Sequence, residues 1–111
     1  MADAPPLLVW STFPNAESAR ACARALVEER LVACANLLPG VESIYRWQGA
    51  VEAASETWAL FKTTQGEYPR LEARLKAMHP YELPEIVAFR PEQGLPAYFQ
   101  WIADNTGKRS A

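Results

Sequence analysis

Residues 32–63 read VACANLLPGVESIYRWQGAVEAASETWALFKT, and this stretch determines the fold class of the 111-residue chain. The run Val32–Leu38 is typical of a strand and stops at Pro39-Gly40, a strong turn signal. Val41–Gln48 continues in extended form. Gln48-Gly49 then predicts a hairpin turn into a third strand, Val51–Thr63. Because that strand exceeds the usual length of about six residues, we expect part of it to extend beyond its own subunit's core.

The flanking residues alternate between strand and helix patterns. Apolar runs predict two more strands, and 3.6-residue periodicity predicts two helices followed by a short aromatic one. In chain order these elements cover Leu7–Phe13 (strand), Ala16–Glu29 (helix), Gly66–His79 (helix), Glu85–Phe89 (strand) and Tyr98–Ile102 (helix). The order β-α-β-β-α-β plus a C-terminal helix predicts an α+β, ferredoxin-like sandwich. This fold hosts many unrelated functions, so it does not identify the chemistry.

Length and charge limit the classes of function. The length of 111 residues predicts a single domain over residues 1–111, with flexible ends at 1–6 and 104–111. The net charge of −2 provides no general attraction for nucleic acid. No apolar run approaches the ~18 residues needed to span a bilayer, and no basic segment opens a secretory signal. We therefore expect a cytoplasmic protein with neither a nucleic-acid nor a membrane partner.

The inventory of reactive side chains is small, with two Cys and one His. These are too few for a four-ligand structural zinc site within one subunit. Cys22 lies on the apolar stripe of the first helix and Cys34 lies between small residues on a strand, so packing explains both. No phosphate loop, Ser-His-Asp order or pair of catalytic carboxylates is present, and we expect no enzymatic activity.

His79 is the principal candidate ligand. It stands at the end of the second helix in the segment Met78-His79-Pro80-Tyr81-Glu82. One interpretation is a turn histidine whose charge complements the helix dipole. The other is a metal contact shared with Met78 and Glu82, because imidazole, thioether and carboxylate ligands suit copper better than calcium or magnesium.

The predicted hairpin carries a second group of candidates. Tyr45 and Trp47 either pack within the subunit or cover a contact between subunits, and we favour the contact. Glu56 and Lys62, on one face of the long third strand, could pair across a boundary or line a cleft. The simplest alternative is that both are solvated charges.

Several motifs, in order, are similar to those of the CutA family of divalent-cation tolerance proteins. They are Thr12–Asn15 (TFPN), Leu31–Gly49 (LVACANLLPGVESIYRWQG), Phe61–Thr64 (FKTT), His79–Ile86 (HPYELPEI) and Tyr98–Ile102 (YFQWI). The resemblance implies a ferredoxin-like subunit in a homotrimer similar in plan to PII-type signalling proteins. Long strands would cross between subunits, placing Tyr45 and Trp47 at interfaces. It also implies tolerance to copper and other divalent metals, with no established catalytic reaction.

The resemblance also indicates where copper would bind. In some bacterial relatives the proposed ligands are a Cys on the first strand and two adjacent His before a Pro-Tyr pair. The corresponding positions here are Ser11, Met78 and His79, so only His79 matches. Because a hydroxyl is a poor replacement for thiolate, we expect at most weak binding of copper or another divalent cation.

Two other functions remain open. A PII-like sensor would hold a small molecule in clefts between subunits, lined by Lys62, Glu56, Tyr81 and Trp47, by analogy of architecture only. A trimeric scaffold would instead anchor a partner protein, for which the aromatic C-terminal helix around Trp101 is the sequence support.

Overall fold

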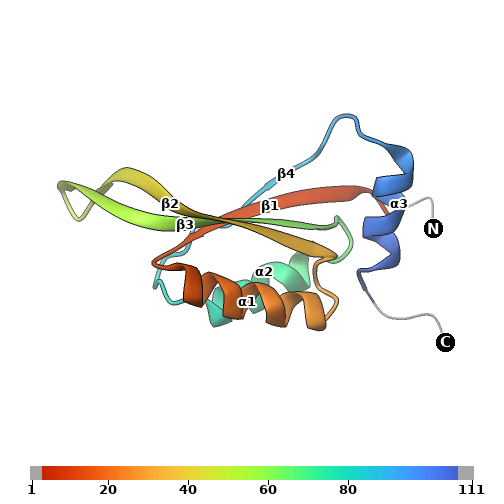
Figure 1. Cartoon of the computed structure of the whole chain (residues 1–111), viewed down its shortest axis with the longest axis horizontal. Helices are drawn as coiled ribbons and strands as arrows, with labels where there is room; N and C mark the ends of the chain where they lie inside the picture. The colour runs from red at the N-terminus through yellow and green to blue at the C-terminus, as the bar shows by residue number, and fades with distance from the viewer. Residues whose placement is uncertain (1–3, 108–111) are drawn as a thin grey trace.

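A long hairpin of two strands dominates the molecule. In the computed structural model, which describes residues 4–107, β2 spans Cys34–Trp47 and β3 spans Ala50–Thr64. Gln48 and Gly49 connect them with positive φ angles of 49° and 85°, the conformation that two-residue hairpin turns favour. The end of the hairpin projects past the helices (Figure 1), and the molecule measures 49 × 27 × 21 Å.

The course of β2 corrects the sequence prediction at Pro39-Gly40. The predicted strand end is wrong, because β2 continues through these residues as one strand with a bulge. Its register against β3 shifts between Leu38 and Val41, and Gly40 has a φ of 78°. The sheet order β2-β3-β1-β4 makes β2 an edge strand, where one side of the backbone has no neighbour and a proline is tolerated.

The centre of the sheet is β1, Pro6–Phe13, which is antiparallel to β3 on one side and to β4 on the other. β4 spans only Val87–Phe89, opposite Leu8–Trp10, and therefore begins two residues after the predicted Glu85. The β-α-β-β-α-β order and the antiparallel sheet confirm the predicted α+β, ferredoxin-like fold.

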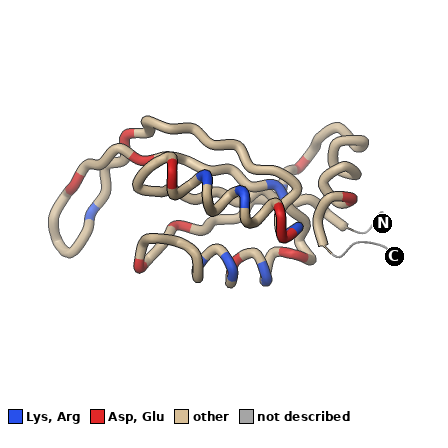
Figure 2. The backbone as a smooth tube through the Cα atoms, turned by 60° about the horizontal axis from the view of Figure 1, so that its bottom comes forward, with Lys and Arg blue, Asp and Glu red and all other residues tan. Residues whose placement is uncertain are grey.

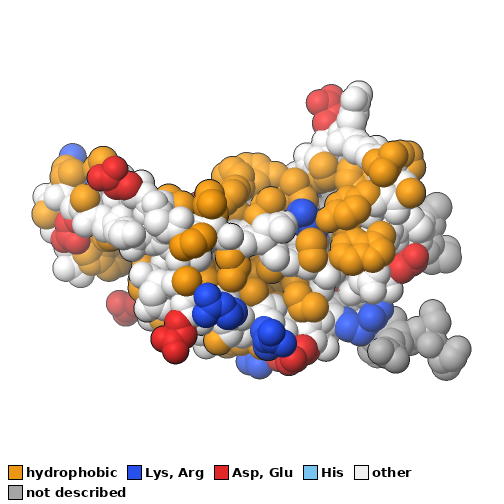
Figure 3. Space-filling view, viewed as in Figure 1, with side chains coloured by type: hydrophobic (Ala, Val, Ile, Leu, Met, Phe, Trp, Pro, Cys, Tyr) orange, Lys and Arg blue, Asp and Glu red, His pale blue; other side chains and the backbone are white. Residues whose placement is uncertain are grey.

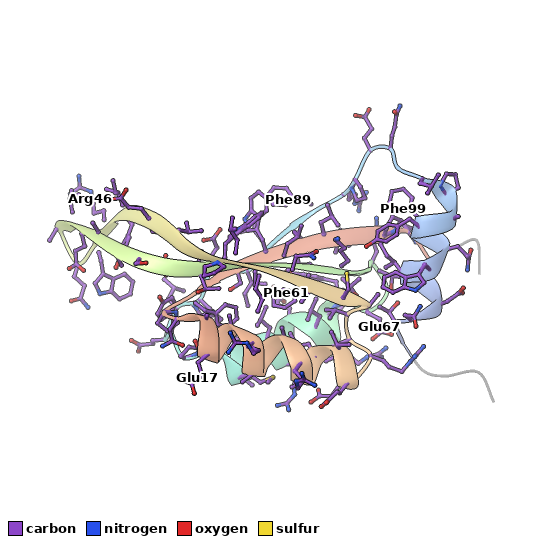
Figure 4. All side chains as sticks on the ribbon, in the orientation of Figure 1. Glu17, Arg46, Phe61, Glu67, Phe89 and Phe99 are labelled. Carbon is purple, nitrogen blue, oxygen red and sulfur yellow. The ribbon has the colours of Figure 1, made fainter. Side chains whose placement is uncertain are left out.

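Helices α1 (Ala16–Glu28) and α2 (Tyr68–Met78) cover one face of the sheet (Figure 1). Alternate residues of β1 and β3 point into the layer between them, and Phe61 is fully buried there (Figure 4). The helices contribute residues at 3.6-residue spacing, including Leu26, Leu71 and Leu75, each with no exposed surface. This arrangement buries one face of the sheet, and neither α1 nor α2 covers the other face (Figure 1).

The open face carries an aromatic cluster. The ring of Trp10 lies 5.1 Å from that of Trp58 and 4.1 Å from that of Phe89, measured between centroids. Figure 4 shows Phe89 on the opposite side of the sheet from Phe61, and Figure 3 shows apolar side chains spread over the strands and the third helix. Phe89 is 39% exposed, so this face is incompletely covered by the chain itself.

The third helix, α3 (Pro96–Asp104), lies at the opposite end of the molecule from the hairpin tip (Figure 1). Arg30 holds the end of this helix by donating to the carbonyl oxygens of Gly107 and Asp104, at 2.7 and 2.8 Å. Residues 104–107 are therefore anchored, although the sequence assigns them to a flexible end. Residues 1–3 and 108–111 of the predicted flexible ends lie outside the described residues. Within residues 4–107, no helix combines the length and apolarity needed to cross a membrane.

Candidate functional site

His79 lies against β1 just after α2, and it is 7% exposed. Its ring stacks on Phe13 with centroids 4.3 Å apart. Nε2 lies 2.9 Å from the carbonyl oxygen of Thr12 and 3.1 Å from Oγ of Ser11. Nδ1 lies 3.1 Å from the backbone nitrogen of Tyr81. Both ring nitrogens are therefore engaged within the chain.

These contacts define the tautomer of the imidazole. The Thr12 carbonyl can only accept, so Nε2 carries a hydrogen, which leaves Nδ1 to accept from the Tyr81 N–H. Burial lowers the pKa of His79 below its ordinary value, while the Thr12 carbonyl and the nearby Glu56 carboxyl oppose that shift. The ring is consequently a neutral donor to β1 near pH 7.

The structure places the three predicted metal residues in different surroundings. Met78 is half-buried and packs against the hydrophobic core, whereas Glu82 is exposed on a cavity beside the hairpin. Ser11, the first-strand position, is fully buried in contact with His79. Within residues 4–107 no three His, Cys, Asp or Glu side chains converge in a group able to hold a metal ion.

The cavity lies where the hairpin leaves the rest of the sheet, and its volume is about 710 Å³. It brings together four of the five predicted cleft residues, Tyr45, Trp47, Glu56 and Tyr81. Register explains part of this arrangement, because Tyr45 stands opposite Glu52 and Val41 opposite Glu56, so these side chains share one face of the hairpin. Tyr81 arrives from the loop that follows α2.

Glu56 and Tyr81 are joined at the cavity. The Tyr81 hydroxyl donates to Oε2 of Glu56 at 2.5 Å. Burial and the neighbouring carboxylate both raise the pKa of Tyr81, so its hydroxyl remains a donor throughout the physiological range. Glu56 is only 9% exposed, which is unusual for a carboxyl group.

Two further acidic residues, Glu52 and Glu85, line the cavity beside the predicted ones. Period-two alternation in the sequence places Glu52 on the same strand face as Glu56, and the register of the hairpin agrees with it. Glu85 belongs to the segment predicted as a strand, and it lines the cavity because the ladder begins only at Val87. Figure 2 shows acidic positions along the hairpin and at its base.

Lys62 lies away from the cavity. Six residues separate it from Glu56 along β3, which corresponds to about 20 Å of strand. Its Nζ lies 5.5 Å from the ring centroid of Tyr98 in α3. Cys34 pairs with Lys62 across the ladder, and its Sγ lies 3.7 Å from the Tyr98 hydroxyl. Lys62 and Glu56 therefore lie apart within one chain, and a cleft between subunits that both of them line stays a prediction.

Comparison with known proteins assigns the chain to a family. The sequence profile described as "CutA1 divalent ion tolerance protein" matches residues 7–105. The "Divalent-cation tolerance protein CutA" of Thermus thermophilus is 51% identical over 90% of this chain and 97% of the relative. "Protein CutA" of Mus musculus is 44% identical over 82% of this chain and 51% of its own length, so the chain spans about half of the mouse protein.

The fold comparison agrees with the sequence comparison. A crystal structure of CutA1 from Oryza sativa matches with a TM-score of 0.92 and 32% identity, covering 97% of this chain and 99% of the rice chain.

Proposed function

Because this chain belongs to the CutA1 divalent ion tolerance family, we propose that it acts in tolerance to divalent cations, copper among them. The observation that carries the proposal is the match over residues 7–105, together with the 51% identity to a protein named for divalent-cation tolerance. We place this activity in the cytoplasm.

Growth of a metal-sensitive bacterial strain that lacks its own family member tests this role. The chain should restore growth in graded concentrations of copper and of other divalent cations, and cell fractionation should recover it with the cytoplasm. Unchanged sensitivity to every cation tested, at normal levels of the protein, would contradict the proposal.

The residues present do not fit a tight copper site. Both nitrogens of His79 are hydrogen-bonded, and Met78 packs against the core instead of facing the exposed Glu82. We therefore expect His79 to provide at most a weak copper contact. Ser11 lies 3.1 Å from Nε2 of His79, and it stands where a thiolate would be the stronger ligand for copper.

Calorimetric titration with Cu(II) and Cu(I) compares the wild type with two variants. His79→Ala should abolish the weak heat of binding, and Ser11→Cys should tighten binding of Cu(I) by placing sulfur beside the imidazole. Identical isotherms for wild type and His79→Ala would show that His79 does not contact copper. The tolerance assay could still succeed, in which case the protective role would act without this contact.

We also infer a homotrimer. Support comes from the aromatic cluster of Trp10, Trp58 and Phe89, in which Phe89 is 39% exposed, and from the hairpin that projects past the helices (Figure 1). Exposed apolar clusters of this kind are typical of surfaces that associate. Mass measurement in solution should give three times the chain mass of 12.4 kDa. A stable monomer at micromolar concentration would refute the assembly.

We propose no catalytic role. Ser11 and His79 are in contact, but Ser11 is fully buried and Nε2 of His79 already carries a hydrogen. The imidazole cannot take a proton from Ser11 in this arrangement, so the pair lacks the nucleophile–base chemistry of hydrolases.

The cavity favours a second candidate function, that of a small-molecule sensor. Support comes from the four predicted cleft residues that line one hollow of about 710 Å³, within the usual size range of ligand sites. A thermal-shift screen tests it, since a ligand that binds only the folded protein raises its melting temperature. The scaffold hypothesis stays a prediction, testable by pull-down with wild type and Trp101→Ala.

A further inference from the structure

Arg30 occupies a backbone position that normally favours glycine. α1 ends at Glu28, Glu29 caps it, and Arg30 follows with a φ of 61°, in the left-handed region. Helices commonly end with one residue in this conformation, and it is usually glycine, because a side chain there costs conformational energy. Such a position persists where the surrounding structure holds it, so we expect the contacts of Arg30 to compensate for the cost.

The side chain and the backbone of Arg30 together hold the segment that ends α3. Nε donates to the carbonyl oxygen of Gly107 at 2.7 Å, and Nη2 donates to that of Asp104 at 2.8 Å. In return, the backbone N–H of Gly107 donates to the carbonyl oxygen of Arg30 at 2.8 Å. All three hydrogen bonds lie within one chain, so they do not depend on the association of subunits.

The charge of Arg30 complements the end of α3. Asp104 is the last residue of this helix, whose final turn contains no basic side chain of its own. The last carbonyl groups of a helix lack intrahelical partners and carry partial negative charge, which a nearby cation stabilises. The two ion pairs among residues 4–107 do not involve Arg30. Its guanidinium group therefore supplies, from the end of α1, the cation that α3 lacks.

The beginning of α3 is attached in a different way. The ring of Phe99 (Figure 4) lies so close to the backbone of Gly94 that an added Cβ there would be 2.1 Å from Cζ of the ring. This contact joins the helix to the loop that precedes it. Within Pro96–Asp104, Ile102 alone is buried by its own chain. Segments with few buried apolar residues are those that open locally, so the docking of the far end of α3 depends strongly on Arg30.

α3 contacts one end of the open sheet face through Tyr98. The Tyr98 hydroxyl lies 3.7 Å from Sγ of Cys34, and Nζ of Lys62 lies 5.5 Å from the centroid of its ring. Cys34 and Lys62 are partners across the β2–β3 ladder, so one tyrosine contacts both of them. Movement of α3 away from the sheet would uncover a thiol and an ammonium group side by side.

We propose that α3 is a lid over Cys34 and Lys62, and that Arg30 is the positioning residue that holds the lid closed. The lid opens about the loop that contains Gly94 when the three hydrogen bonds at Arg30 break. The hydrophobic core stays intact during this opening, because α1 and α2 pack on the other face of the sheet. The proposal depends neither on a copper contact at His79 nor on a ligand in the cavity.

Thiol labelling of the assembled protein, followed by mass spectrometry, tests the lid with Cys34 as the reporter. Cys22 is the internal control, because it is 3% exposed on the buried face of α1 and reacts only when the chain unfolds. Arg30→Gly suits the left-handed backbone but removes both side-chain hydrogen bonds. It should raise the labelling rate of Cys34 roughly 10-fold and leave that of Cys22 unchanged. Arg24→Gln, which removes an exposed charge from α1, should change neither rate.

Two further measurements keep the test valid if Arg30→Gly fails to fold. Arg30→Lys keeps the cation but not the planar fork that reaches two carbonyl oxygens, so its Cys34 rate should lie above that of the wild type. In the wild type, urea below the unfolding midpoint should accelerate the labelling of Cys34 with a weaker concentration dependence than that of Cys22, because a lid exposes less surface than unfolding does. Equal acceleration at both cysteines would indicate a general loss of stability and overturn the proposal. A Cys34 rate that neither Arg30 variant changes would overturn it as well.

Discussion

Protonation of His79 should destabilise the protein as the pH falls below neutrality. In the neutral ring, Nε2 donates to the Thr12 carbonyl and Nδ1 accepts from the Tyr81 N–H at 3.1 Å. An added proton on Nδ1 would face that N–H, so the hydrogen bond would be lost. Burial independently lowers the pKa of His79 below its ordinary value of 6.5, because the charged ring loses hydration inside the protein.

The sign of the effect follows from proton binding. Between the lowered pKa of the folded state and the ordinary value of 6.5, the unfolded chain binds more protons than the folded chain. The free energy of unfolding is therefore at its full value above pH 6.5 and declines as the pH falls through this interval. One proton per chain limits the slope to about 1.4 kcal/mol per pH unit. His79 is the single histidine of the chain, and histidine is the side chain whose ordinary pKa lies in this range.

Urea unfolding between about pH 7.5 and 5, at one protein concentration, measures this slope. His79→Asn is the control, because the amide oxygen can accept from the Tyr81 N–H while the side chain does not titrate. Wild type should lose stability towards pH 5 more steeply than the variant. Parallel pH profiles for the two proteins would refute the assignment of a neutral, buried imidazole.

Three further predictions concern packing and reactivity. Phe61→Ala should lower the free energy of unfolding by about 3–5 kcal/mol, since the ring is fully buried; a loss below about 1 kcal/mol in chemical denaturation would contradict its place in the core. Gly94→Ala should lower the melting temperature, because the added Cβ would lie 2.1 Å from Cζ of Phe99. Gly66→Ala is the control, since a Cβ at Gly66 meets nothing within 4 Å. Equal melting temperatures for the two variants would contradict the close approach of Phe99 to Gly94. Cys22 should resist alkylation near pH 8 until the chain unfolds, because burial raises its thiol pKa to about 11; mass spectrometry showing rapid modification of the native protein would disagree.

Sequence patterns predicted most of the fold because the relevant signals are local. The turn at Gln48-Gly49 and the alternation along β3 depend on near neighbours, and both were confirmed. Pro39-Gly40 predicts the end of a strand, whereas the structure has a bulge there, because the same dipeptide suits either. The choice depends on whether the strand lies at a sheet edge, which local sequence does not reveal.

The candidate site was less predictable because it depends on long-range placement. Tyr45 and Glu56 share a face through strand register, so a hairpin prediction brings them together. The burial of Glu56 depends on Tyr81, which follows α2 and is 25 residues away in sequence. The hydrogen bond from Nε2 of His79 goes to the carbonyl oxygen of Thr12 on β1, and no local sequence pattern predicts that contact.

The bulge in β2 affects how copies of this chain behave when crowded. An exposed edge strand of regular pairing geometry would offer its backbone to any other unpaired strand, which is the first step of cross-β aggregation. Pro39 has no N–H to donate, and the register shift between Leu38 and Val41 interrupts the regular repeat of β2. A second β2 edge therefore cannot pair with the first along its whole length. The bulge that replaces the predicted strand end therefore also works against regular edge-to-edge pairing of β2 between copies of the chain.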